Sequence, residues 1–78
     1  MPVIIYSVYV GKYDKPSAVK NDLKKINSLG LQGFTFSRNS HYALKVFTSP
    51  NKEKALYVKR FLEGNGFETE FEERVVKN

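Results

Sequence analysis

Residues 6–30 of the chain are YSVYVGKYDKPSAVKNDLKKINSLG, and the spacing of the apolar side chains changes within this stretch. Apolar and polar residues alternate at first, which is the two-residue period of a strand with one buried face. Further along, Val19, Leu23 and Ile26 recur at the i, i+4 and i+7 spacing of an amphipathic helix. Gly30 then suits the C-terminal cap of that helix. The stretch therefore predicts a strand followed by a helix.

The rest of the chain continues these two periods in a regular order. Ser49 or Asn51 is the expected N-cap of a second helix. Its apolar stripe is formed by Ala55, Val58 and Leu62. We expect strands over residues 3–10, 31–37, 41–48 and 67–75, and helices over residues 14–30 and 49–66. The order of elements is β-α-β-β-α-β.

The second half of the chain resembles the first half when the sequence is displaced by 36 positions, which places Gly30 on Gly66. The matches fall at core and cap positions. We therefore interpret residues 1–78 as a single domain made of two βαβ-like halves, about 3–38 and 39–76. This order is typical of the α+β, ferredoxin-like (RNP-like) fold. It predicts a four-stranded antiparallel sheet in the order 4-1-3-2, with both helices on one face.

The composition is that of one small globular domain of 78 residues, with 41% hydrophobic and 14% aromatic side chains. No apolar run approaches the roughly 18 residues of a membrane span, so we expect no membrane insertion by this chain. The chain has no cysteine, and His41 is its single histidine. The sequence therefore predicts no metal site, no cofactor and no catalytic triad, and we expect a protein that is not an enzyme.

The formal net charge of +5 is unevenly distributed along the chain. Residues 1–60 hold eleven basic side chains against three acidic ones, and residues 61–78 hold two against five. A basic body with an acidic final segment indicates an anionic partner, although a solvated lysine-rich surface is equally compatible with this pattern.

Strand parity assigns side chains to the sheet face that the helices leave free. The first strand contributes Ser7 and Tyr9 to this face. The third and fourth strands contribute His41, Ala43, Lys45 and Phe47, and Glu68, Glu70 and Glu72. Exposed rings gathered on a sheet face usually mark a binding surface. A dimer interface, or coverage of the face by the C-terminal tail, are the structural alternatives.

The orientation of the second strand is ambiguous from the sequence. If Leu31 points inward, Phe34 and Phe36 point outward and join the free face. A β-bulge at Gly33 would instead return both rings to the core. The two orientations are equally compatible with the pattern.

Two segments, YSVYVGKY (residues 6–13) and EKALYVKRFLEGNGFETEF (residues 53–71), resemble the repeats of SPOR domains. Each repeat of that family has the pattern Tyr-x-Val-x-Val-Gly-x-Phe, a helix with an Ala/Leu stripe, then Gly-Phe and a strand. The resemblance covers nearly the whole chain. It implies a non-catalytic module that binds peptidoglycan, particularly glycan strands stripped of their stem peptides, at division septa or in sporulating bacterial cells. It also implies the cell envelope if the chain is a module of a longer protein, whereas a complete chain would be expected in the cytoplasm.

The resemblance also assigns positions in the binding site. Tyr9 falls where the family usually has a ligand-facing glutamine in its first strand, and Lys45 is the equivalent residue of the second repeat. Gly11 and Tyr13 stand at the Gly-x-Phe of the first repeat, which is replaced by residues 47–49, Phe-Thr-Ser, in the second. The expected ligand-binding residues are Ser7, Tyr9, Tyr13, Phe34, Phe36, Arg38, His41, Lys45 and Phe47. Among them, Lys45 or Arg38 would pair with a lactyl carboxylate of the glycan.

An RNA-binding sheet of the RRM type is the alternative, because it shares the β-α-β-β-α-β order. Residues 8–13, VYVGKY, fit its first-strand motif loosely, with Tyr9 at the base-stacking position. Residues 40–47, SHYALKVF, lack its Arg/Lys-Gly opening. Three glutamates along the fourth strand would repel a phosphate backbone, which favours a glycan over RNA. A protein-interaction or homodimerisation module that uses the same face is the third possibility.

Overall fold

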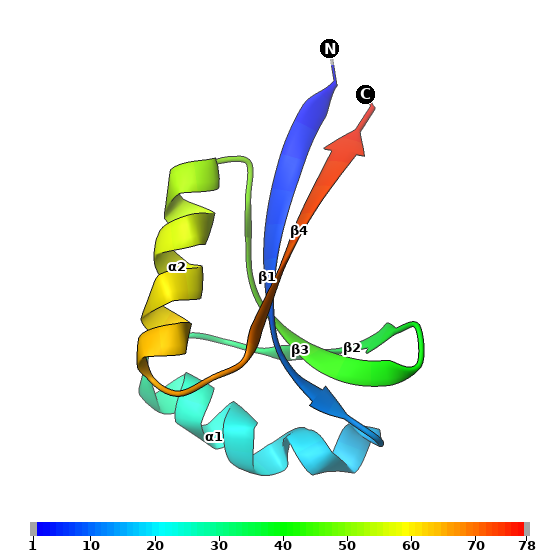
Figure 1. Cartoon of the computed structure of the whole chain (residues 1–78), viewed down its shortest axis with the longest axis vertical. Coiled ribbons are helices and arrows are strands. Elements are labelled where there is room, and N and C mark those ends of the chain that lie inside the picture. Colours follow the sequence, from blue (N-terminus) through cyan, green and yellow to red (C-terminus); the bar gives the residue numbers. More distant parts are fainter. Residues whose placement is uncertain (1, 78) are drawn as a thin grey trace.

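The computed structural model describes residues 2–77 and confirms the expected fold class. A four-stranded antiparallel sheet is covered on one face by two helices (Figure 1). The strands are β1 (Val3–Tyr13), β2 (Phe34–Arg38), β3 (His41–Ser49) and β4 (Thr69–Val76). The helices are α1 (Lys20–Ser28), which follows a 3₁₀ turn (Pro16–Val19), and α2 (Lys52–Gly64). Within residues 2–77, no helix has the length and apolar character needed to cross a membrane.

The strands lie in the order β2-β3-β1-β4, and each neighbouring pair is antiparallel. This arrangement confirms the predicted order 4-1-3-2. In Figure 1, β1 and β4 lie side by side at the end of the molecule where both termini lie, β1 running away from that end and β4 toward it, whereas the β2–β3 hairpin turns across them. The sheet is therefore strongly twisted, as expected for right-handed strands.

The hydrophobic core lies between the sheet and the helices. Its buried residues come from β1, β3 and the helical segments, and are Val8, Val10, Val19, Ile26, Leu44, Val46, Ala55 and Leu62. Leu23 and Val58 pack at its margin, so the apolar stripes predicted for both helices face the sheet. Asn51 is the N-cap of α2, because its Oδ1 accepts a hydrogen bond from the Lys54 N–H at 3.1 Å.

The strand boundaries differ from the sequence expectation by up to three residues, and the largest differences are at the start of β2 and the end of β1. β2 begins at Phe34 instead of residue 31, because the Leu31 N–H donates to the Ile26 carbonyl at 3.2 Å and closes the end of α1. β1 continues past residue 10 to Tyr13, which pairs with Tyr42 of β3. Both differences concern the turns between elements and leave the order of elements unchanged.

A β-bulge reverses the orientation of the C-terminal part of β3. Val8 of β1 pairs with Phe47, but the next residue, Tyr9, pairs with Lys45, so Val46 is an extra residue in β3. Val46 is buried and Phe47 packs against the core. The expectation that Phe47 lies on the free face was therefore wrong, because the bulge turns two consecutive apolar residues toward the helices.

A second bulge lies near the end of β1. Val10 pairs with Leu44 and Tyr13 pairs with Tyr42, so β1 has one more residue than β3 between these two pairs. Gly11 has a φ of 76°, a conformation that glycine adopts without a steric penalty. The extra residue directs Tyr13 toward the helices, where it packs against the core.

Candidate functional site

The sheet face away from the helices, which we call the open face, collects most of the residues predicted to bind a ligand. Phe34 lies opposite Lys45, and Tyr9 lies between Lys45 on β3 and Glu70 on β4. Phe34 and Phe36 point away from the helices and are 64% and 43% exposed, which resolves the ambiguity of the second strand. The part of the open face that concerns the site comprises Ser7, Tyr9, Phe34, Phe36, Arg38, His41, Ala43, Lys45, Glu70 and Glu72.

Tyr9 points outward from the sheet, yet its side chain is only 2% exposed. The guanidinium carbon of Arg38 lies 4.0 Å from the centre of the Tyr9 ring, and the Phe36 ring lies 5.9 Å away between centroids. The Tyr9 hydroxyl donates to Glu72 Oε1 at 3.0 Å. Burial, together with the hydrogen bond to Glu72, raises the pKa of Tyr9. Tyr9 is therefore the floor of the open face, and a ligand on this face would meet Arg38 and Phe36 before the Tyr9 ring.

Arg38, Glu70 and Glu72 form an ionic cluster across the open face, which we call the clasp. Arg38 Nη1 lies 3.3 Å from Glu72 Oε2, and Arg38 Nη2 lies 3.7 Å from Glu70 Oε2. Arg38 belongs to β2 and the two glutamates to β4, the opposite edges of the sheet. In a flat sheet three strand spacings would separate these edges by about 14 Å. The Arg38 side chain extends over the Tyr9 ring of β1 to reach the two glutamates of β4.

The clasp sets the ionisation of Glu72. Burial opposes the charged carboxylate, but the hydrogen bonds from Tyr9 and Arg38, with the positive charge of Arg38, outweigh it. The net result is that the pKa of Glu72 lies below its ordinary value of 4.5. Glu72 is thus ionised at neutral pH and held by its neighbours.

The accessible part of the open face lies around Lys45. Its Nζ lies 5.0 Å from the centre of the Phe36 ring, and within residues 2–77 it makes no ion pair. A hollow of about 250 Å³ beside it is lined by Gln32, Phe34, Lys45 and residues 46–48. This region combines two exposed rings with an ammonium group that is available to a ligand.

The remaining predicted residues lie at different places. Ser7 is buried on the open face, with its Oγ 3.2 Å from Thr48 Oγ1. His41 lies at the margin of the same face, with its Nε2 3.5 Å from Glu70 Oε1. Tyr13 does not join this face, because its hydroxyl donates to Asp22 Oδ2 on α1 at 2.6 Å. Burial and this hydrogen bond raise the pKa of Tyr13, which is a structural residue of the helix side.

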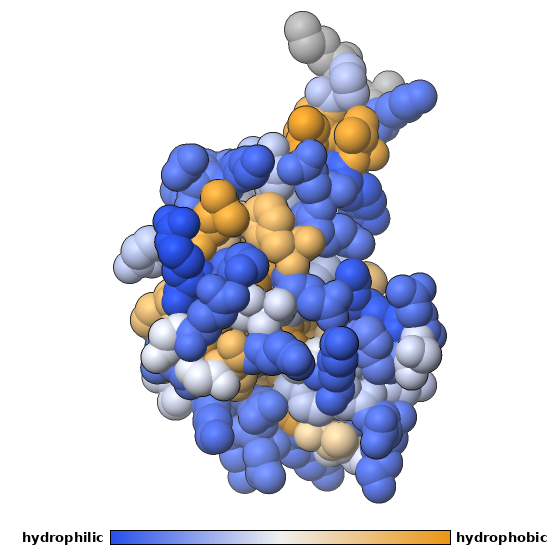
Figure 2. Space-filling view, in the orientation of Figure 1, coloured by the Kyte–Doolittle hydropathy of each residue, from blue (hydrophilic) through white to orange (hydrophobic). Residues whose placement is uncertain are grey.

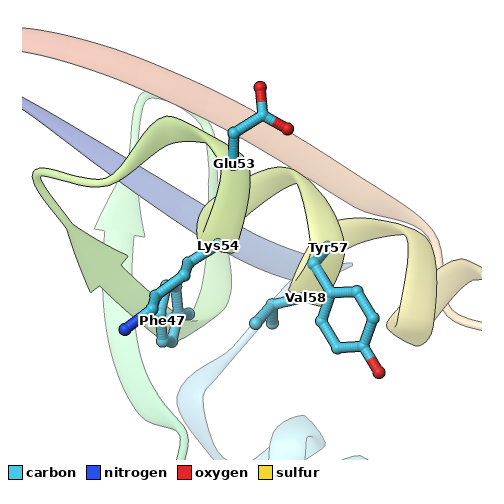
Figure 3. Close-up of a pocket in the computed structure, with 5 residues that line it drawn as sticks. All are labelled: Phe47, Glu53, Lys54, Tyr57 and Val58. Carbon is cyan, nitrogen blue, oxygen red and sulfur yellow. The ribbon is translucent and has the colours of Figure 1, made fainter.

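Phe47 lines a different hollow, between β3 and α2, that the sequence analysis did not predict (Figure 3). This hollow has a volume of about 370 Å³, and its other lining residues are Glu53, Lys54, Tyr57 and Val58. In Figure 3 the Val58 and Lys54 side chains lie beside Phe47, while Glu53 points away from it. Tyr57 is 67% exposed and lies outside the buried stripe of α2. An aromatic residue at such a position is the feature of the sequence that could have indicated this hollow.

No known family model matches the sequence, and no curated protein is similar to it at the sequence level. The fold has a solved counterpart. It is similar to the solution structure of the peptidoglycan binding domain of the B. subtilis cell wall lytic enzyme CwlC, with a TM-score of 0.76. The superposition covers 91% of this chain and 90% of the CwlC domain, at 13% sequence identity. At that identity the similarity shows a shared fold.

The chemistry of the open face suits binding. An acid–base pair needs one carboxyl group whose pKa is raised, whereas the pKa of Glu72 is lowered by its partners. Within residues 2–77, no three His, Cys, Asp or Glu side chains gather as a metal site. Exposed rings, one available ammonium group and a fixed ionic cluster are the groups that a ligand would meet.

Proposed function

We propose that this chain is a non-catalytic module that binds peptidoglycan glycan strands through its open face. The observation that carries the proposal is the pair of exposed rings, Phe34 and Phe36, beside Lys45 on the open face. The shared fold with the peptidoglycan binding domain of CwlC supports the same function. The resemblance of the sequence to SPOR repeats, over residues 6–13 and 53–71, points to the same function.

The proposed contacts follow from the chemistry of the glycan. A sugar ring presents an apolar face of C–H groups, which packs on an aromatic ring such as Phe34. Removal of a stem peptide leaves the lactyl carboxylate of muramic acid free and charged. Lys45 is suited to pair with this carboxylate, because it has no ionic partner among residues 2–77. The proposal therefore favours stripped strands over strands that carry peptides.

The clasp argues against RNA as the ligand. Arg38 is already paired with Glu70 and Glu72, so its charge is neutralised before any phosphate arrives. The face of the Tyr9 ring, which an RRM would use to stack a base, is covered by Arg38. These contacts weaken both the phosphate and the stacking contributions to RNA binding.

Binding to purified, amidase-treated peptidoglycan tests the proposal, with a single-stranded RNA as the parallel ligand. We expect Phe34→Ala to weaken glycan binding by about 1–2 kcal/mol, which is about a tenfold change, because a stacked ring is lost. Tyr57→Ala is the matched control, because Tyr57 is similarly exposed, at 67% against 64%, but lies on α2. Equal effects of the two substitutions would contradict the proposal.

A salt series separates the two ligand classes. An RNA-binding protein loses affinity with a log–log slope of about −0.7 per phosphate contact on single strands. A glycan held by rings and one or two carboxylates should show a slope of about −1 or shallower. Tight RNA binding with a slope near about −3, abolished by Lys45→Glu, would replace the glycan proposal with an RNA-binding function.

A further inference from the structure

The outer edge of β4 is an unpaired strand edge of eight residues. β4 pairs with β1 alone, and its other edge has no partner strand within residues 2–77. Natural proteins usually shorten, cover or block such an edge, because it can pair with another chain. Near the end of the molecule where the termini lie, Val75 is 58% exposed and Ile4 is 39% exposed, and Figure 2 shows apolar surface there.

The backbone groups that face this edge can be assigned. The Gly11 N–H donates to the Glu68 carbonyl at 2.9 Å, so Gly11 and Glu68 are a hydrogen-bonded pair. In an antiparallel ladder, bonded and non-bonded pairs alternate. Because the β1–β4 register continues without a shift, the even-numbered residues of β4 bond to β1. The N–H and C=O groups of residues 69, 71, 73 and 75 therefore face outward.

We propose that β4 pairs with β4 of a second copy of this chain, antiparallel about a two-fold axis at Glu73, to form a continuous eight-stranded sheet. A two-fold axis perpendicular to the sheet keeps the faces of both copies aligned, so odd residues oppose odd residues and even oppose even. In this register Glu72 of each copy lies opposite Arg74 of the other copy. Phe71 of each copy lies opposite Val75 of the other.

Charge selects this register over its neighbours. A two-fold axis at Glu72 would place Glu72 against itself and Phe71 against Glu73. An axis at Arg74 would place Arg74 against itself and Glu73 against Val75. Like charges directly opposite each other destabilise a strand pair, and unlike charges stabilise it. The axis at Glu73 gives two Glu72–Arg74 pairs and two apolar pairs.

The one unfavourable contact in the chosen register is Glu73 against Glu73. It is offset in each copy by Lys52, whose Nζ lies 4.0 Å from Glu73 Oε1. The pairs at residues 71, 73 and 75 use backbone groups that are otherwise free. The proposal does not depend on the ligand of the open face, but it would place two open faces side by side on one sheet.

The oligomeric state over a concentration series from about 10 µM to about 1 mM tests the proposal by sedimentation equilibrium. We expect a reversible dimer that Glu73→Pro abolishes, because proline removes an outward-facing N–H and leaves the bonds to β1 intact. Thr35→Pro is the matched control on the opposite edge strand, β2. We expect it to leave the dimer unchanged. A monomer at every concentration, or a dimer lost only with Thr35→Pro, would overturn the proposal.

Single cysteines test the register independently of the proline variants, because the chain has no cysteine of its own. At the two-fold axis the Cα atoms of Glu73 in the two copies would lie about 5.5 Å apart, within the range that a disulfide spans. We therefore expect Glu73→Cys to form a covalent dimer on mild oxidation. Val75→Cys should remain largely unlinked, because its two copies would lie about 13 Å apart along the strands. Equal linking of the two variants would overturn the register.

Discussion

At the scale of the residue, Tyr9 shows that outward parity and exposure are separate properties. Its strand position directs the ring away from the core, but Arg38 and Phe36 cover it and its hydroxyl donates a hydrogen bond to Glu72. The ring is consequently as buried as the core residue Val8. Its contribution to stability should be that of a core side chain, and its contribution to binding should be indirect.

We expect Tyr9→Ala to reduce the free energy of unfolding by about 3 kcal/mol, the scale for removing a buried ring. Tyr9→Phe should reduce it by about 1 kcal/mol, because only the hydrogen bond to Glu72 is lost. Urea unfolding measures both changes. Phe34→Ala, at a ring that is 64% exposed, should stay within about 0.5 kcal/mol of the wild type. Equal stability of Tyr9→Ala and Phe34→Ala would show that the Tyr9 ring is not buried in solution.

At the scale of the element, side-chain periodicity predicted the strands and helices but not the irregularities within them. The i, i+4, i+7 stripe ending at Ile26 and the cap at Asn51 are local features, so the sequence contains them. The bulge in β3 is different, because Val46 and Phe47 are both apolar and either can face the core. Alternation cannot choose between them. The assignment of Phe47 to the open face failed for this reason.

The bulge at Gly11 gives a prediction at this scale. Gly11 and Gly30 both have a positive φ, of 76° and 87°, which disfavours any other residue. A methyl group at Gly11 would also collide with the Tyr13 ring, whereas none of the surrounding atoms lies within 4 Å of one at Gly30. We expect Gly30→Ala to cost about 1 kcal/mol and Gly11→Ala about 2–3 kcal/mol, measured by urea unfolding. Equal losses would mean that Tyr13 does not pack over the bulge.

At the scale of the whole molecule, the clasp joins the two edges of the sheet across its open face. Parity predicted from the sequence that Glu70 and Glu72 lie on this face, and Arg38 was expected to bind the ligand as a possible partner of a glycan carboxylate. Their mutual contact was not predictable, because it depends on the twist of the sheet and on the reach of the Arg38 side chain over the Tyr9 ring. Sequence spacing says which face a residue occupies, and only the assembled sheet says which residues meet.

The clasp should make stability depend on pH. The pKa of Glu72 is lower in the folded chain than its ordinary value of 4.5, so near pH 4.5 the unfolded chain binds more protons at this residue. The stabilisation by Glu72 is therefore fully present above about pH 4.5 and is lost as the pH falls through the lower folded value. We expect Glu72→Gln to lower the free energy of unfolding at neutral pH. Below about pH 4.5, the free energy of unfolding of this variant should fall less than that of the wild type.

Urea unfolding midpoints between about pH 7 and pH 2.5 measure this dependence. Glu68→Gln is the matched control, because Glu68 is an exposed glutamate just before β4 and makes no ion pair within residues 2–77. The control should keep the acid sensitivity of the wild type, since it leaves Arg38, Glu70 and Glu72 in place. An identical pH profile for the wild type and Glu72→Gln would mean that the clasp does not hold the two edges of the sheet together in solution. In that case the Tyr9 ring would be more accessible in solution than the contacts around it indicate.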